Sequence, residues 1–314
     1  MSRASSKTLY DVVILTDVRY LNDSKIDHYK HNVYYEDRLV YHALEQIGLK
    51  TLRLPWDDMF FDWSSTKAIL FRSTWDYFDR FDEFSDWLEQ VSDQTLLLNS
   101  ETLIRWNIDK HYLLDLDQKG IHIAESHFIE KGAKTTLAQI HDILNWKLTV
   151  LKPCISGAAR HTYKLTSETL EEHEAIFQEL IKKEAMLLQP FQHNIVNKGE
   201  ISMMVFNGHF SHAVLKTAKA GEFRVQDDFG GSVSHYTPSE EEIKFSERAV
   251  SACPEIPIYA RVDMFEDNNG KTTLSELELI EPELWFRLHK EAAMLLAQGV
   301  LERIRSLGDM SHNP

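Results

Sequence analysis

The chain has 314 residues, which is more than one hydrophobic core usually serves, so we expect two or three lobes. Its formal net charge of −15 repels phosphate backbones and argues against a nucleic-acid partner. The two cysteines form no CxxC pair, which indicates neither a structural zinc site nor a disulfide framework. The N-terminal segment lacks the apolar core of a signal peptide, and no stretch reaches the roughly 18 apolar residues of a membrane span. We therefore expect a cytoplasmic protein without a membrane partner.

Strand and helix patterns alternate through the first third of the chain. Buried strands are predicted at 12–15, 49–54, 68–71 and 95–98. Apolar residues at helical spacing predict one helix around Val40 and Leu44 and another over 81–91, and a long polar loop is expected from 17 to about 32. This alternation indicates a mostly parallel sheet with helices on its faces.

The pattern changes after about residue 108, where hairpin signals replace the alternation. Asn207-Gly208 lies between two alternating runs, and Asn269-Gly270 does so again, which is typical of two-residue hairpin turns. A further helix is expected from about 289 to 306. The coarse prediction is a parallel α/β lobe followed by lobes that contain antiparallel sheet.

Glutamates alternate with leucines on a predicted strand near the C-terminus. Because the side chains of a strand alternate between its two faces, Glu276 and Glu278 share one face. If the second Asn-Gly pair forms the turn, the preceding strand places Asp263 opposite Glu276 and Arg261 opposite Glu278. The three acids then form one patch on a pair of strands.

Directly opposed like charges destabilise a strand pair by up to about 1 kcal/mol, so this acidic patch favours a bound cation. Hard oxygen ligands suit Mg²⁺, with Mn²⁺ as a substitute. The structural alternative is a solvated strand face whose acids are balanced by Arg261. A shift of one residue in the turn would also spoil the predicted register.

The sequence contains no Walker A loop and no GxGxxG fingerprint, so a nucleotide site needs another architecture. Between about 105 and 290, several short motifs follow one another in a fixed order: Lys152-Pro153, 156–159, 187–191, Gly199-Glu200, 221–224, Gly230-Gly231, Asp263 and 276–278. This ordered set resembles ATP-grasp enzymes of the glutathione synthetase type. The segments 72–77, 106–110 and 278–282 resemble more closely one subgroup, which includes the ATP-grasp enzyme that closes the ring of cycloserine.

The resemblance implies an α/β protein with the ATP-grasp fold and an N-terminal parallel α/β domain. We expect this substrate domain over residues 1–108, a small lid subdomain over 109–185, and a C-terminal catalytic subdomain over 186–314. ATP would lie between the last two. One departure from glutathione synthetase is that its Glu-x-Asn pair is Glu276-x-Glu278 here, with Arg261 available to offset the added charge.

The resemblance also implies a set of nucleotide contacts. The residues that would bind ATP are Lys110, Lys152, Ser156, Gly157, Gln189, Phe191 and Glu200. The two lysines would contact the phosphates, and the Ser-Gly pair belongs to a loop that covers them. The glutamine and phenylalanine would flank adenine, and the glutamate would accept hydrogen bonds from the ribose hydroxyls. Each also has an ordinary structural alternative as a solvated or core side chain.

Catalysis and substrate binding are assigned in the same way. Lys152 and Arg224 would act at the reacting centre, where a guanidinium stabilises developing negative charge, although Arg224 can instead pair with a nearby aspartate. Metal ligands would be Asp263, Glu276 and Glu278. Substrate contacts would come from Asp17, Arg72 and Ser73, because ligands of open parallel sheets bind beyond the carboxyl ends of the strands. The resemblance also implies that Gly230 and Gly231 let the backbone approach the substrate or a phosphate.

The function that follows from the resemblance is ATP- and Mg²⁺-dependent ligation. The enzyme would activate a carboxylate-like group of a small amino-acid-like substrate as an acyl phosphate, for attack by an amine that gives an amide, a peptide or a ring. Two alternatives stay open: a catalytically inactive nucleotide-binding module, and a metal-dependent hydrolase that uses the same carboxylates. A homodimer is also allowed.

Overall fold

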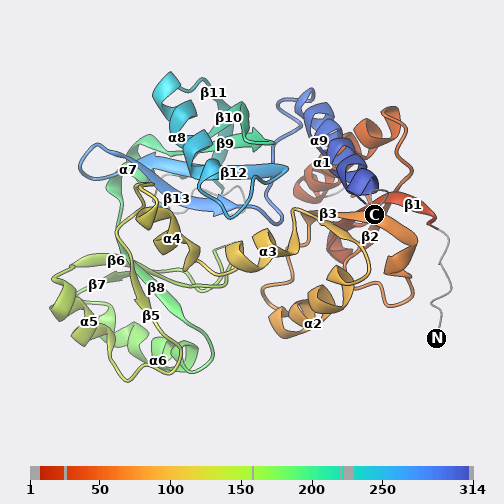
Figure 1. Ribbon diagram of the computed structural model, residues 1–314. Helices are drawn as coiled ribbons and strands as arrows, with labels where there is room; N and C mark the ends of the chain where they lie inside the picture. Colours follow the sequence, from red (N-terminus) through yellow and green to blue (C-terminus); the bar gives the residue numbers. More distant parts are fainter. Residues whose placement is uncertain (1–7, 25–26, 158, 220, 223–229, 311–314) are drawn as a thin grey trace.

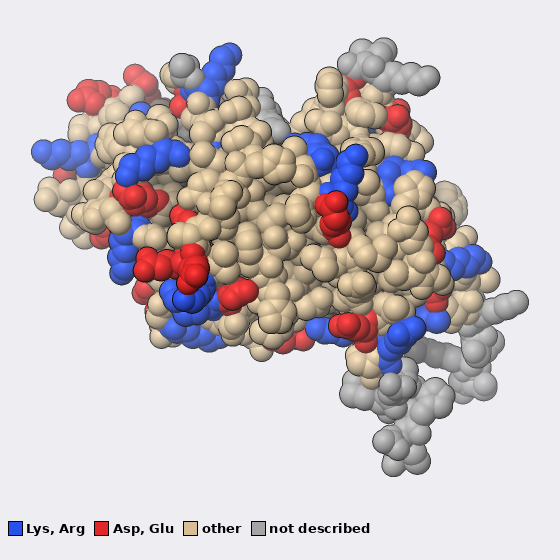
Figure 2. Space-filling model, turned by 90° about the horizontal axis from the view of Figure 1, so that it is seen from above, with Lys and Arg blue, Asp and Glu red and all other residues tan. Residues whose placement is uncertain are grey.

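Three β-sheets organise the computed structural model, which describes residues 8–24, 27–157, 159–219, 221–222 and 230–310. Figure 1 shows the first sheet and its helices at one end of the molecule, and the two other sheets at the opposite end. None of the helices in these described ranges is both long and apolar enough to span a membrane. On the face in Figure 2, basic side chains lie singly or beside acidic ones.

The first sheet is parallel and has the strand order β2-β1-β3-β4. Its strands are β1 (Tyr10–Thr16), β2 (Thr51–Pro55), β3 (Thr66–Ser73) and β4 (Leu96–Leu98). The connecting helices are η1 (Val18–Tyr20), α1 (His28–Gln46), η2 (Trp63–Ser65) and α2 (Phe81–Ser92). The predicted strands, their helices and the parallel arrangement are confirmed.

The loop expected from 17 to about 32 is shorter than predicted. The Asp27 carboxylate accepts the backbone N–H groups of Tyr29 and Lys30, both at 3.1 Å, and so caps the start of α1 at His28. Satisfying these otherwise orphaned amides lets the helix begin in a polar stretch where hydrophobic spacing gave no signal.

The second sheet is antiparallel, with the order β5-β8-β6-β7. Its strands are β5 (His127–Ile129), β6 (Leu148–Pro153), β7 (Tyr163–Thr166) and β8 (Met186–Pro190). The helices α5 (Leu137–Leu144) and α6 (Leu170–Ile181) pack on it around Phe177, while α3 (Glu101–Asn107) and α4 (Tyr112–Gln118) lead into it from the first sheet. β8 starts where the third lobe was expected, yet it pairs with β5 and β6.

The third sheet is also antiparallel and runs β11-β10-β9-β12-β13. Its strands are β9 (Glu200–Phe206), β10 (His209–Thr217), β11 (Ser232–Tyr236), β12 (Tyr259–Glu266) and β13 (Thr272–Glu278). The helices α7 (His193–Lys198), α8 (Glu240–Ser251) and α9 (Ala292–Met310) accompany it. The Asn207-Gly208 hairpin is confirmed, since Phe206 pairs with His209 and both turn residues have positive φ.

The parallel sheet is buried on both faces, and one face connects it to the rest of the molecule. Val13 and Leu15 pack towards α2, whereas Val12 and Ile14 belong to a core that includes α1, α9 and Phe286. In Figure 1, α9 lies beside α1 although the two are far apart in sequence. This shared core holds the end of the chain against the first lobe.

Two buried asparagines fix the start of β12 and the end of β13. The Asn99 amide donates to the carbonyls of Tyr259 (2.9 Å) and Leu279 (2.8 Å), and its oxygen accepts the N–H of Ile258 (2.6 Å). Asn107 in α3 bonds to Leu277 O and Leu279 N, both at 2.8 Å. The strand that carries Glu276 and Glu278 is therefore held by groups from outside its own sheet.

We expect Asn99→Leu to lower the free energy of unfolding by on the order of 3 kcal/mol. It leaves three buried backbone groups unpaired, each costing about 1–3 kcal/mol, with little change in volume. Urea denaturation measures the difference, and Glu89→Ala at an exposed position of α2 is the matched control. A loss no larger than that of the control would contradict this role of Asn99.

Candidate active site

A cavity of about 580 Å³ lies where the three sheets meet, within the roughly 300–1,000 Å³ typical of ligand sites. It is lined by β6 and β8 of the second sheet, by four strands of the third sheet, and by segments near Arg19 and Trp75 of the first lobe. Ten of the predicted site residues line it: Lys110, Lys152, Ser156, Gly157, Gln189, Phe191, Glu200, Asp263, Glu276 and Glu278. The fold thus brings the expected nucleotide and metal residues into one place.

The carboxylates owe their positions to a β-bulge. Asp263 faces Glu276 and Arg261 faces Glu278, as predicted. The turn differs from the predicted two-residue turn, because Asp267 and Lys271 close a loop of three residues. The strand pairs next to this loop are therefore shifted by one residue from the predicted register. Ser275 then has no partner in the ladder and restores the predicted register at the acidic residues.

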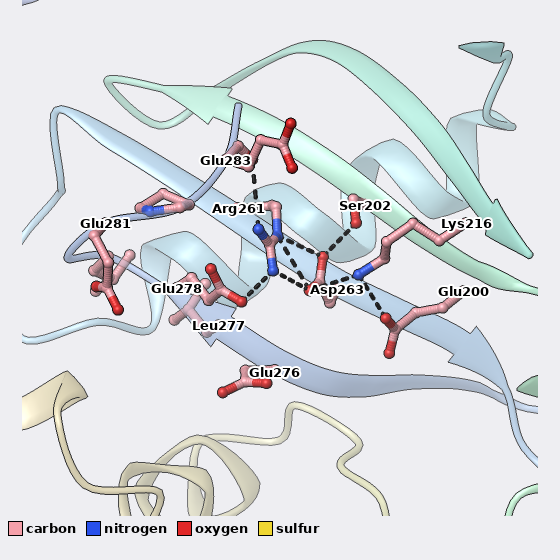
Figure 3. A network of polar contacts seen from close by, with 12 residues as sticks. Glu200, Ser202, Lys216, Arg261, Asp263, Glu276, Leu277, Glu278, Glu281 and Glu283 are labelled. Carbon is pink, nitrogen blue, oxygen red and sulfur yellow. Dashed lines mark hydrogen bonds and ion pairs between the residues drawn. The ribbon is translucent and has the colours of Figure 1, made fainter. Parts of the chain in front are cut away.

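Arg261 lies between two of these carboxylates (Figure 3). Its guanidinium donates to both oxygens of Asp263 at 2.8–3.1 Å and also contacts Glu278. Lys216 Nζ lies 3.0 Å from Asp263 and 2.6 Å from Glu200, and Ser202 Oγ donates to Asp263 at 2.5 Å. Burial opposes ionisation of Asp263, but Arg261 and Lys216 hold the pKa of this carboxyl well below its usual range.

Glu276 and Glu278 have opposite electrostatic surroundings. Burial opposes ionisation of Glu276, but Lys110 at 2.9 Å and the nearby Lys152 lower its pKa. Burial raises the pKa of Glu278 to about 8, with the adjacent carboxylates adding to the effect and Arg261 opposing it. The row therefore gathers three carboxyl groups with their basic partners in one cavity, and such oxygen donors fit a divalent cation.

The two predicted phosphate lysines line the same cavity as the carboxylates. Lys110 Nζ donates to Ser156 O at 2.8 Å, which ties it to the loop after β6. The Lys152 side chain forms no hydrogen bond or ion pair with any described residue, and burial lowers its pKa. Its ammonium lines the cavity without an anionic partner, which is the electrostatic requirement for binding phosphate oxygens.

The remaining predicted nucleotide residues surround one end of this cavity. The Gln189 side chain donates to Ser126 Oγ at 2.9 Å, and Phe191 lies beneath Lys164 Nζ, 4.3 Å from the ring centroid. Gly157 has no room for a side chain, because a Cβ there would come within 2.5 Å of the Phe78 ring. This end combines a flat aromatic surface, polar groups and Glu200 at its edge.

The predicted substrate residues do not line the cavity. Ser73 Oγ donates to Asp37 at 2.8 Å, and the Arg72 guanidinium donates to Pro282 O at 3.0 Å, so both are buried in the structure behind it. Asp17 is buried and paired with Arg19. Gly230 is exposed and Gly231 half-buried, whereas Arg224 lies outside the described residues.

Lys216 and Glu281 line the site but were not predicted. An extra residue at Ser211 shifts the β9–β10 register, so that Lys216 rather than Leu215 faces Glu200. In a hairpin without this bulge, Lys216 would lie on the face of the sheet that points away from the cavity. The sequence gives no clear signal for the bulge. Glu281 follows β13 in an irregular segment, where alternation of faces does not apply.

A separate group of potential metal ligands consists of Asp109, His111 and Cys154, whose ligand atoms lie within 4.8 Å of one another. The His111 ring nitrogens contact Asp109 at 2.6 Å and Glu130 at 3.1 Å, which accounts for this proximity. Burial raises the pKa of the Cys154 thiol, which disfavours a thiolate ligand. We assign no metal to this group.

Comparison with known proteins agrees with this geometry. The family profile described as the N-terminal domain of D-cycloserine synthetase DcsG matches residues 12–99. The cycloserine biosynthesis protein DcsG of Streptomyces lavendulae is 28% identical over 284 residues, which cover 84% of this chain and 92% of the relative. The crystal structure of D-cycloserine synthetase DcsG superimposes with a TM-score of 0.82 and 25% identity, covering 93% of this chain and 99% of that one.

The structure of the ATP-grasp ligase PsnB with a minimal precursor, Mg and ADP has a TM-score of 0.60 and 13% identity, and covers 94% of this chain and 98% of that one. The fold is that of ATP-grasp ligases, and the similarity to DcsG extends over most of the chain. Within the class it lies near D-cycloserine synthetase. The predicted resemblance and the α/β ATP-grasp fold are confirmed.

Replacing Glu281 should alter how stability depends on pH. Burial raises the pKa of this carboxyl from its ordinary value of 4.5 to about 7. The contribution of the Glu281 carboxyl to the free energy of unfolding is therefore complete below its pKa in the unfolded chain. This contribution is lost as the pH rises through its pKa in the folded protein. Between about pH 5 and about pH 8, the free energy of unfolding should fall more in the wild type than in Glu281→Gln.

Urea denaturation at several pH values measures this difference, with Glu291→Gln at an exposed position as the control. The control should follow the wild type. If Glu281→Gln also follows it, the buried carboxyl does not titrate as described.

Proposed function

We propose that this chain is an ATP- and Mg²⁺-dependent ligase that activates the carboxylate of a small amino-acid-like substrate as an acyl phosphate, which an amine then attacks. The observation that carries the proposal is the arrangement of charge in the cavity. Lys152, which has no anionic partner among the described residues, and Lys110, which pairs with Glu276, line the same cavity as Asp263, Glu276 and Glu278. A triphosphate with a divalent cation complements the lysines and the carboxylates at once.

Each group of residues has one task in this account. Lys110 and Lys152 bind the phosphates, Gln189 and Phe191 flank the adenine, and Glu200 accepts the ribose hydroxyls. Asp263, Glu276 and Glu278 would hold Mg²⁺, or Mn²⁺ in its place. When bound there, the metal supplies positive charge to the phosphate oxygens.

The reaction consists of two displacements. A substrate carboxylate oxygen attacks the γ-phosphorus of ATP, and ADP leaves. The amine nitrogen then attacks the acyl carbon, phosphate leaves, and the nitrogen loses a proton. Arg261, which lines the cavity, and Arg224, which lies outside the described residues, are the guanidinium groups assigned to the negative charge of the reacting centre. Whether the product is an amide, a peptide or a ring depends on the substrate.

Two features support a small-molecule substrate and a cytoplasmic location. A small-molecule substrate fits the volume of the cavity, and both cysteines are free and buried, as in a reducing cytoplasm where ATP is abundant. The three-lobe division and the homodimer stay predictions. The two alternatives, an inactive nucleotide-binding module and a metal-dependent hydrolase, differ from the ligase in ADP release and in the need for nucleotide.

We expect ATP with Mg²⁺ to raise the melting temperature of the wild-type protein, and neither ligand alone to do so fully, because metal and phosphates bind together. Incubation with pools of amino acids and amines should then release ADP, measured by a coupled enzyme assay. Stabilisation without ADP release from any pool would favour the inactive module. Hydrolysis that does not require nucleotide would favour the hydrolase.

Lys152→Met should reduce ADP formation by about 100-fold, the scale expected when one preorganised cation is removed from a reacting centre. Its free energy of unfolding should stay close to that of the wild type, because the lysine lacks an ion-pair partner among the described residues. Lys183→Met, at an exposed position of the same lobe, is the control that keeps full activity. Near-normal turnover in Lys152→Met would contradict the assignment.

A further inference from the structure

The acidic side chains of the cavity form a row with two different ends. In Figure 3, Glu200 lies at one end beside Lys216, Asp263 and Glu278 follow, and Glu281 lies at the other end. Glu200 belongs to the nucleotide end, together with Gln189 and Phe191. Glu281 therefore lies on the far side of the metal carboxylates, where the substrate must approach the phosphates.

Glu281 differs from the other acids of the row in its partners. Glu278 is paired with Arg261, and Glu283 is paired with Arg287. The Glu281 carboxylate accepts a hydrogen bond from the Tyr77 hydroxyl, but none of the described basic side chains forms an ion pair with it. Burial raises the pKa of Glu281, as expected for a carboxyl that lacks a counter-charge.

The backbone holds this carboxylate in a fixed position. Trp75 Nε1 donates to the Glu281 carbonyl at 2.9 Å, and Arg72 donates to the carbonyl of the next residue, Pro282, at 3.0 Å. Tyr77 is buried against Phe84, with ring centroids 4.7 Å apart, so its hydroxyl is also fixed. The group is thus preorganised rather than a mobile surface acid.

Aromatic rings surround the same end of the cavity. Tyr20 meets Trp75 edge to face at 5.4 Å, and Tyr29 lies 6.3 Å from the same indole. All three line the cavity, and aromatic faces attract cations. The guanidinium of Arg19, which also lies here, is neutralised by Asp17.

We propose that Glu281, with the Tyr77 hydroxyl and the rings of Trp75, Tyr20 and Tyr29, binds a primary ammonium group of the substrate. This inference rests on the proposed ligase function and deepens it, because it names the residue that selects amine-bearing carboxylic acids. The ammonium supplies the counter-charge that the described side chains do not, and a carboxylate beside aromatic rings recognises it with charge-assisted hydrogen bonds. Glu281 acts as a substrate-binding residue in this account.

The test compares wild type, Glu281→Gln and Glu291→Gln for ADP release with ATP and Mg²⁺ at about pH 8, where Glu281 is largely ionised. The probes are the L- and D-amino acids, with hydroxylamine as the nucleophile, and the N-acetyl derivative of each active amino acid. We expect Glu281→Gln to raise the KM of the active amino acid roughly tenfold or more, because it replaces a charged hydrogen bond by a neutral one. The KM for ATP should stay unchanged, and N-acetyl derivatives should be inactive.

Three results would overturn the inference without affecting the proposed function. The first is an unchanged KM for the amino acid in Glu281→Gln, and the second is N-acetyl derivatives that react as well as the free amino acids. The third is a change in Glu291→Gln equal to that in Glu281→Gln, which would show a general charge effect. Nucleotide binding without ADP release from any amine-bearing probe would contradict the inference and the ligase function together. Failure of ATP and Mg²⁺ to stabilise the wild type would contradict the proposed function.

Discussion

Arg261 binds two carboxylates of neighbouring strands, and the rest of the site depends on this interaction. Asp263 and Glu278 would repel each other across the hairpin if no cation lay between them. Lys216 and Lys110 extend the same compensation to Glu200, Asp263 and Glu276. Buried charges persist only where partners and hydrogen bonds replace the lost water, so this array is stable as a unit. The same array keeps several oxygen donors together in one cavity.

Positioning of the array comes from outside its own sheet. Asn99 and Asn107 bond to the backbone at the end of β13. Trp75 donates to the Glu281 carbonyl, and Arg72 donates to the Pro282 carbonyl. The first lobe thereby fixes the segment that joins the metal carboxylates to Glu281. The metal carboxylates Glu276 and Glu278 and the substrate-end Glu281 thus lie on one continuous segment that the first lobe holds in place.

Much of this arrangement is predictable from sequence, for reasons that are local. Buried strands of the first lobe and the shared face of Glu276 and Glu278 follow from periodicity, and the ordered motifs identify the fold. The register at Asp263 was predicted correctly although the turn was not, because the bulge at Ser275 compensates for the longer loop. The bulge at Ser211 brings Lys216 to the site, and periodicity does not foresee it. The Asp37 network that engages Arg72 and Ser73 depends on contacts between distant segments, which local patterns do not encode.

A crystal structure with a non-hydrolysable ATP analogue and Mg²⁺ tests the central claim most directly. The account predicts adenine beside Gln189 and Phe191, phosphates beside Lys110 and Lys152, and the metal bound to oxygens of Asp263, Glu276 and Glu278. An analogue bound elsewhere, or phosphates that approach neither lysine while the carboxylates stay bound only to Arg261, Lys216 and Lys110, would contradict it.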